Sequence, residues 1–177
     1  MIVSPLLVKA IHSLPKKMAL ELGFGNGIEL LYLISKEWYV TGIEKDSLLI
    51  NEIKKLELEH LELIQEDILN YSFEKKFDLI NCSYVLHFLK ENARIILKKI
   101  QEATNPDGIN LIITFLDKGE FEKFNEGFFK ENELKELYSD WQILEYFEKE
   151  VNTKEIKSDG TQKKQFAGFL LAIKKNR

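Results

Sequence analysis

The sequence has a single cysteine, no excess of basic residues and no long hydrophobic run. The lone Cys82 cannot form an internal disulfide, and such usage is typical of a reducing compartment. A net charge of -4 argues against a general nucleic-acid-binding protein, which would usually carry a basic face. The longest apolar run, Phe166–Ile173, is too short to span a bilayer. We therefore expect no nucleic-acid or membrane partner.

The start of the chain does not have the features of a secretory signal. Residues 1–15 are partly apolar, but Pro5 and Lys9 interrupt them, and a basic start and a small-residue cleavage site are lacking. This pattern predicts a cytoplasmic protein. The 177 residues, 45% of them hydrophobic and 31% charged, fit one globular domain, 1–177. Nothing near Cys82 completes a ligand set, so we expect no metal.

Strand-like and helix-like patterns alternate along the first two thirds of the chain. The expected strands are 18–22, 39–44, 61–64, 77–82 and 109–116. The expected helices are 5–14, 28–36, one capped by Asp46, and a second capped one from about Asn92 to Thr104. Strands separated by helices must pair in parallel through crossover connections.

The pattern changes after Asp117, so the end of the sheet should be built differently. A turn at 106–108 precedes the fifth strand, and a Phe-rich loop, 119–127, and a helix, 130–138, follow that strand. Two further strands, 141–151 and 165–173, are joined by a polar loop without a helix and should form an antiparallel hairpin. The predicted fold is α/β, with seven mostly parallel strands and one antiparallel member.

The stretch MALELGFGNG carries the clearest ligand signal. A short apolar strand runs into Gly23, Gly25 and Gly27, and a helix follows, so backbone N–H groups can face a ligand. The pattern G-x-G-x-G lacks the spacing of a dinucleotide loop, and no Gly-Lys-Ser/Thr of a phosphate loop follows. Glu21 would repel a pyrophosphate but suits an ammonium group. The glycine loop and Glu21 together indicate a zwitterionic ligand that contains a nucleoside, such as S-adenosylmethionine (SAM).

Other polar residues stand at the carboxyl ends of the expected strands, where ligands of α/β sheets bind. Glu44 ends the second strand and could accept from both ribose hydroxyls. Asp67 follows the third strand and could accept from an adenine amine, while the N–H of Ile68 donates to a ring nitrogen. Residues 81–84 end the fourth strand, near the expected methionyl tail and reacting centre.

The segments ELGFGNG, GIEKD, QEDI and FDLINCSYVLHFL, in this order, resemble class I SAM-dependent methyltransferases. Three later segments, PDGINLIITFLDKGEF, FFKENELKELYSDWQILEYFEKEV and QFAGFLLAIKK, resemble the tellurite-resistance (TehB-like) subfamily. This resemblance implies a Rossmann-like three-layer sandwich of strand order 3-2-1-4-5-7-6. It also implies SAM as methyl donor, S-adenosylhomocysteine as product, and a small acceptor such as a tellurium or selenium oxyanion or a thiol.

The resemblance also implies site residues. Those that would hold SAM are Glu21, Gly23, Gly25, Asn26, Gly27, Glu44, Lys45, Asp67, Ile68, Asn81, Cys82 and Ser83. Those expected nearest the acceptor are Tyr84, His87 and Asp117, with His87 best suited as a base. Family members offer His and Arg in the loop before the last strand. Here that loop, 152–164, has four lysines instead: Lys154, Lys157, Lys163 and Lys164.

Purely structural roles for some of these residues, and other functions for the protein, remain open at this point. His87 could simply be packed, Cys82 could be a small buried residue, and most of the phenylalanines could be core. A nicotinamide- or flavin-dependent oxidoreductase is compatible with Glu44, although Glu21 and the glycine spacing weigh against it. A non-catalytic SAM-binding regulatory domain is a further alternative. The sequence allows either a monomer or a homodimer.

Overall fold

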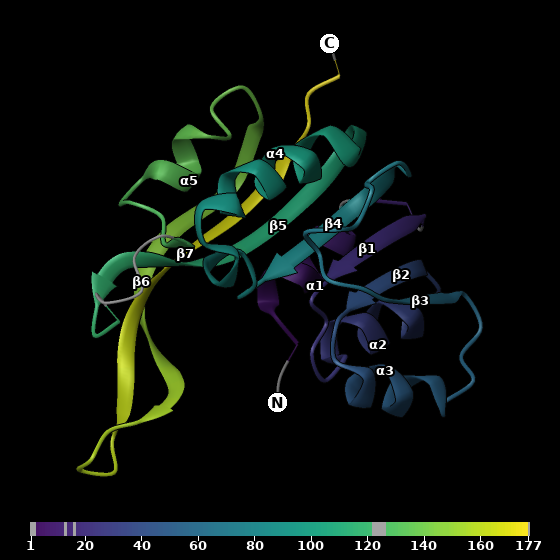
Figure 1. Ribbon diagram of the computed structural model, residues 1–177. Coiled ribbons are helices and arrows are strands. Elements are labelled where there is room, and N and C mark those ends of the chain that lie inside the picture. The colour runs from purple at the N-terminus through teal and green to yellow at the C-terminus, as the bar shows by residue number, and fades with distance from the viewer. Residues whose placement is uncertain (1–2, 13, 16, 122–126, 177) are drawn as a thin grey trace.

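A single seven-stranded sheet dominates the computed structural model, which describes residues 3–12, 14–15, 17–121 and 127–176 (Figure 1). Its strands are β1 Met18–Leu22, β2 Tyr39–Glu44, β3 Leu61–Gln65, β4 Phe77–Ser83, β5 Thr104–Gly119, β6 Gln142–Ile156 and β7 Gln162–Ile173. Their order is β3-β2-β1-β4-β5-β7-β6. Strands β1 to β5 pair in parallel, whereas β7 is antiparallel to both β5 and β6. The predicted order and the single antiparallel strand are confirmed.

Helices cover both faces of the sheet (Figure 1). On one face lie α1 Pro5–His12, α2 Ile28–Ser35 and α3 Ser47–Lys54, and their apolar sides pack with Trp38 and β2 in one hydrophobic cluster. On the other face lie η1 Leu86–Asn92, α4 Ala93–Ala103 and α5 Glu133–Glu136, which pack in a second cluster. Because each face has its own buried layer, the fold is the expected three-layer sandwich.

The central strands are buried on both faces, as parallel strands between two helical layers must be. In β4 the first six residues, Phe77 to Cys82, are all buried, including the polar Asp78 and Asn81. The edge strand β6 is instead largely polar and exposed. Within the described ranges, no helix is long and apolar enough to cross a membrane.

Local capping signals were read correctly at one helix and wrongly at another. The Asp46 carboxylate accepts from the backbone N–H of Leu48 at 2.8 Å and caps α3, as predicted. Asn92 makes no side-chain cap, because the preceding 3-10 helix η1 already gives it helical backbone angles. The predicted helix 130–138 is reduced to α5, which begins only after Asn132, a residue with φ 61.

The C-terminal hairpin is longer than the sequence predicts. Most of the expected loop 152–164 is strand, since Asn152 pairs with Lys164 and Ile156 with Gln162. Figure 1 shows this hairpin reaching well beyond the neighbouring strand ends. The expected turn at 106–108 lies inside β5, where Asp107 has φ 62 and the pairing with β4 shifts register. Residues 122–126 of the expected Phe-rich loop lie outside the described residues.

Candidate functional site

A cavity of about 1230 Å³ opens at the carboxyl ends of β1 and β4, where the strand order changes direction. In parallel sheets this switch point is the usual ligand site. The β1 side of the wall consists of Glu21, Gly23, Phe24, Gly25, Asn26 and Glu29. The rest of the wall includes Asn81 and Ser83 of β4, Tyr84, His87, Phe88 and Lys90 after it, and Phe115, Phe121, Phe128, Phe169 and hairpin residues 152–155. The cavity therefore has a polar, acidic end and an aromatic end.

Glu21 and Asn81 face each other across the pairing of β1 with β4. The Asn81 amide donates to both carboxylate oxygens of Glu21, at 3.1 and 2.9 Å, and the Ser83 hydroxyl donates to the Asn81 carbonyl at 2.7 Å. Only 2% of Glu21 is exposed, and burial raises the pKa of its carboxyl well above the usual 4.5. No cation among the described residues pairs with it, so this carboxylate can accept a ligand's positive charge.

The glycine loop leaves space on its cavity side. Gly25 has φ 55, and nothing lies within 4 Å of the position that a Cβ would take there. Its backbone N–H donates to Glu44 at 3.1 Å, which ties the loop to the end of β2. Gly27 is the N-cap of α2, and a Cβ there would lie only 2.7 Å from the Ile53 side chain. The loop thus combines close packing behind with an open face toward the cavity.

The residues predicted to read the nucleoside lie beside the glycine loop but are not part of the cavity wall. Glu44 also accepts from the backbone N–H groups of Lys45 and Asp46, at 2.9 and 3.1 Å. The Lys45 ammonium lies 3.9 Å from Asp67, which accepts from a backbone N–H of its own turn. Ile68 lies against Gly23. The structure therefore brings the tips of β1, β2 and β3 together.

His87 lies at the aromatic end, in η1, with only 6% of its surface exposed. Its ring stacks on Phe115, with centroids 4.2 Å apart, and neither ring nitrogen has a hydrogen-bond partner among the described residues. Burial lowers the pKa of His87 to about 4, so its imidazole is neutral near neutral pH. Tyr84 directly follows β4 and has φ 59. Burial raises the pKa of its phenol.

Gly27, Cys82 and Asp117 are further predicted site residues that do not line the cavity. The Cys82 side chain is fully buried in the hydrophobic cluster of the α4 face, and burial raises the pKa of its thiol. Asp117 is exposed, and its backbone N–H donates to Phe129 at 2.9 Å. Of the hairpin lysines, Lys154 lines the cavity, whereas Lys157 and Lys163 pair with Glu120 and Glu155.

Several cavity residues were missed by sequence reasoning. Phe24, Glu29, Phe88, Lys90 and Phe169 all face the cavity. Phe88 and Lys90 could have been found, since they directly follow the strand that ends at the site. Most of the phenylalanines were expected to be core, but Phe115, Phe121 and Phe128 line the cavity; Phe129 is core, and Phe124 lies outside the described residues.

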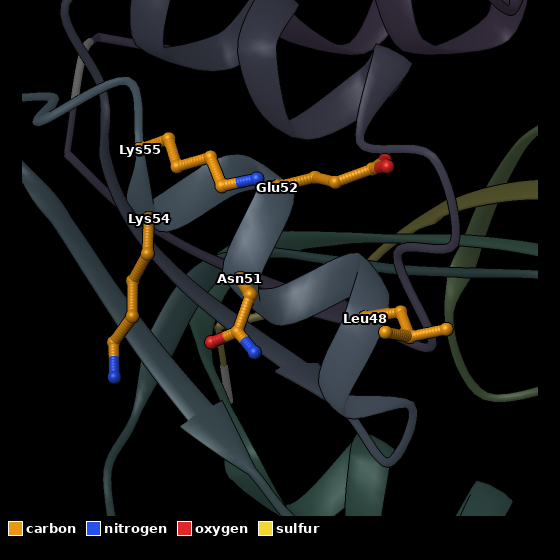
Figure 2. Close-up of a pocket in the computed structure, with 5 residues that line it drawn as sticks. All are labelled: Leu48, Asn51, Glu52, Lys54 and Lys55. Carbon is orange, nitrogen blue, oxygen red and sulfur yellow. The ribbon is translucent and has the colours of Figure 1, made fainter.

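A second hollow, of about 600 Å³, lies on the outside of α3 (Figure 2). Its lining residues are Leu48, Asn51, Glu52, Lys54 and Lys55. Figure 2 shows these side chains spreading from one helix in different directions instead of converging on a point. It contains no strand-end residue, and we assign it no role. Within the described residues, no group of three His, Cys, Asp or Glu side chains could hold a metal ion.

Comparison with known structures identifies the fold class. The N-methyltransferase NodS from Bradyrhizobium japonicum WM9 matches with a TM-score of 0.71 at 18% identity, over 97% of this chain and 93% of that one. The same enzyme in complex with S-adenosyl-L-homocysteine matches with a TM-score of 0.70. The chain thus has the Rossmann-like fold of SAM-dependent methyltransferases, as the sequence predicts.

Closer relatives identify the family. The family described as "Tellurite resistance protein TehB" matches residues 4–170, and this chain belongs to it. The crystal structure of TehB from Haemophilus influenzae matches with a TM-score of 0.87 at 30% identity, over 98% of this chain and 63% of that one. The probable S-adenosyl-L-methionine-dependent methyltransferase TehB of H. influenzae (strain 10810) is 33% identical over 165 residues. That alignment covers 88% of this chain and 57% of the relative, so the chain spans little more than half the relative's length.

Proposed function

We propose that this chain is a SAM-dependent methyltransferase domain, 1–177, that methylates a small nucleophilic acceptor. The observation that carries the proposal is Glu21, a buried carboxylate with only a neutral amide partner, at the wall of a glycine-lined cavity. An ammonium group would satisfy this carboxylate, whereas a pyrophosphate would be repelled by it. The family membership and the names of the relatives support the same donor.

The residues present fit such a donor. Asn81, Ser83 and the glycine loop would hold its methionyl part, next to Glu21. Glu44 would turn to the ribose hydroxyls, and Asp67 and Ile68 would contact the adenine. When bound, SAM supplies an activated methyl group on a sulfonium centre. The chain's work is then to hold the acceptor in line with that methyl group and to exclude water.

The aromatic end of the cavity would hold the acceptor. Tyr84 and Phe115 pack edge to face, with ring centroids 5.6 Å apart, and form an apolar wall suited to a soft nucleophile and to a nearby cationic sulfur. Lys90 and Lys154, both exposed at the cavity, would attract an anionic acceptor. A tellurium or selenium oxyanion or a small thiol is the acceptor class that the family name and these residues support. The buried lone Cys82 is consistent with a reducing compartment such as the cytoplasm.

Two measurements test the proposal. Calorimetric titration should show that the protein binds SAM and does not bind NAD; the opposite result would favour the oxidoreductase reading. Release of S-adenosylhomocysteine should then depend on an acceptor drawn from selenite, tellurite and a panel of thiols. Tight SAM binding without release for any acceptor would instead indicate a regulatory, non-catalytic domain.

A further inference from the structure

Gln165 of β7 is fully buried at a point where the pairing of β5 with β7 is interrupted. The regular pairing on β5 ends at Phe115 and resumes only at Gly119, which lies opposite Gln165. Between these two pairs, β5 has the three residues 116–118 and β7 only Phe166. A bulge of this kind leaves backbone groups without their usual partners in the neighbouring strand. Because a buried unpaired group is costly, these backbone groups need another partner.

The side chain of Gln165 is that partner. Its amide nitrogen donates to the backbone carbonyl of Leu116 at 2.6 Å, and its amide oxygen accepts from the backbone N–H of Phe121 at 3.0 Å. Gly119 makes room for the amide, since a Cβ there would collide with the amide oxygen of Gln165. One side chain thus fixes both ends of the segment 116–121 to β7.

This segment and the residue before it carry two rings of the cavity wall. Phe115 and Phe121 both line the cavity, and their rings stack with centroids 6.2 Å apart and an interplanar angle of 12°. Phe115 also packs edge to face against Tyr84 of the same wall. Gln165 itself does not line the cavity, and its amide is neutral. Any effect of Gln165 on a ligand must therefore act through the positions of these rings.

The acceptor in a methyl transfer must lie in line with the methyl group, and a misplacement of about 1 Å can lower the rate about a hundredfold. Resting on the proposed methyltransferase activity, we propose that Gln165 is a positioning residue, which fixes Phe115 and Phe121 and, through them, the alignment of the acceptor. The Glu21 end of the cavity is built from β1 and the glycine loop, so binding of the donor should not depend on Gln165.

The test compares Gln165→Met with Asn110→Leu. Each change keeps the approximate size of the side chain and removes its hydrogen bonds. Asn110 on β5 is also fully buried, and its amide donates to Thr104 at 2.7 Å and accepts from Tyr138 at 2.9 Å. Neither Asn110 nor these two partners line the cavity. Both variants should have a lower melting temperature than wild type, which is all that a purely structural role predicts.

The kinetic comparison is made well below both melting temperatures. The acceptor is the member of the panel of selenite, tellurite and thiols that gives the fastest release of S-adenosylhomocysteine with wild type. We expect its kcat/KM to fall about tenfold or more in Gln165→Met. In Asn110→Leu this kcat/KM, and in both variants the Kd for SAM, should stay within about twofold of wild type. Equal kcat/KM in Gln165→Met and wild type, equal losses in the two variants, or a matching loss of SAM affinity would overturn the inference.

A second variant, Gln165→Glu, covers the case in which Gln165→Met does not fold. Its carboxyl group can still accept from Phe121, but it can donate to Leu116 only when it is protonated. Buried carboxyl groups can titrate as high as about pH 8–9. The kcat/KM of Gln165→Glu relative to wild type should therefore rise as the pH is lowered from about 9 to about 6. A ratio that does not rise contradicts the inference.

Hydrogen exchange tests the hold on the segment without any turnover. The amide of Phe121 should exchange faster in Gln165→Met than in wild type, whereas that of Gly23, which donates to Ile43 at 2.8 Å, should not change. Unchanged exchange at Phe121 sinks this inference alone. Wild type that fails to bind SAM, or that releases no S-adenosylhomocysteine with any acceptor of the panel, sinks the proposed function and this inference with it.

Discussion

The side-chain amide of Asn81 donates to both carboxylate oxygens of Glu21, between two strands paired in register at the centre of the sheet. The amide is neutral, so it orients the carboxylate without cancelling its charge. Burying an ionised carboxylate with so little compensation is unfavourable in the free protein. The arrangement makes sense if a cationic group arrives with the ligand, and the first two predictions follow from this pair.

Replacing Glu21 with Gln should weaken SAM binding by about tenfold or more, because charge-assisted hydrogen bonds contribute roughly 1.5–3 kcal/mol. The free variant should be as stable as wild type or more so, since a neutral amide replaces a buried carboxyl group that is costly to ionise. Calorimetric titration and urea unfolding measure the two effects. Glu62→Gln, an exposed acid on β3, is the control and should leave affinity unchanged. Equal affinity of Glu21→Gln and wild type would show that Glu21 does not meet the ammonium.

In the pH range just above 4.5, where the raised pKa keeps Glu21 protonated, binding of SAM should release a proton. Burial raises the pKa of Glu21 above 4.5, so between 4.5 and that raised value the folded protein holds a proton that the unfolded chain has lost. In this window the unfolding free energy falls as pH rises, because the native state binds more protons. A bound ammonium favours the carboxylate and drives the proton off. Titrations in two buffers of different ionisation enthalpy should therefore give different heats, and Glu21→Gln should remove the difference.

His87 should destabilise the protein in acid. Its pKa falls from 6.5 to about 4 on burial, so below pH 6.5 the unfolded chain takes up a proton first and stability is lost as pH falls toward 4. His87→Phe removes this loss. Its advantage over wild type in unfolding free energy should grow by about 2 kcal/mol between neutral pH and about pH 5, at 1.36 kcal/mol per pH unit. Urea unfolding at both pH values checks this, with Thr114→Val as a variant whose offset should not change with pH.

Gly25→Ala should damage the ligand site more than the fold. A Cβ at Gly25 meets nothing within 4 Å, so the cost to folding is the left-handed φ alone, about 1–2 kcal/mol. Gly160, in the hairpin turn, has φ +83 and is equally open, which makes Gly160→Ala the matched control. Both variants should lose similar stability in thermal unfolding. Only Gly25→Ala should lose SAM affinity, and similar affinities of the two variants would place the ligand elsewhere.

The central strands were predictable because their signals are local. β1, β2 and β4 are buried between two helical layers, so each appears in the sequence as a short, mostly apolar segment next to a turn or a loop. The cap at Asp46 also depends only on neighbouring residues. The same holds for Glu21, whose place next to the glycine loop follows from two residues of spacing.

The remaining features depend on contacts between distant segments. The outer part of the hairpin has a polar sequence, and cross-strand ion pairs such as Lys163–Glu155 and Lys164–Glu150 accompany its pairing, so hydrophobic alternation could not show it. Phe169 of β7 lines the cavity. Because it is far from the glycine loop in the sequence, no local pattern could predict this contact. Asn92 has the residue type of a cap but follows a helical turn, and tertiary context overrides the local preference there.

The switch in strand order has one more consequence. The Glu21 end of the cavity is built from β1 and the glycine loop, whereas the aromatic end takes Phe115 from β5, Phe169 from β7 and further rings from the segment after β4. Because the two ends of the cavity rest largely on different strands, we expect mutations at one end to affect the other end little. Under the proposed function, we expect mutations in the hairpin to change the acceptor and to leave binding of the methyl donor as it is.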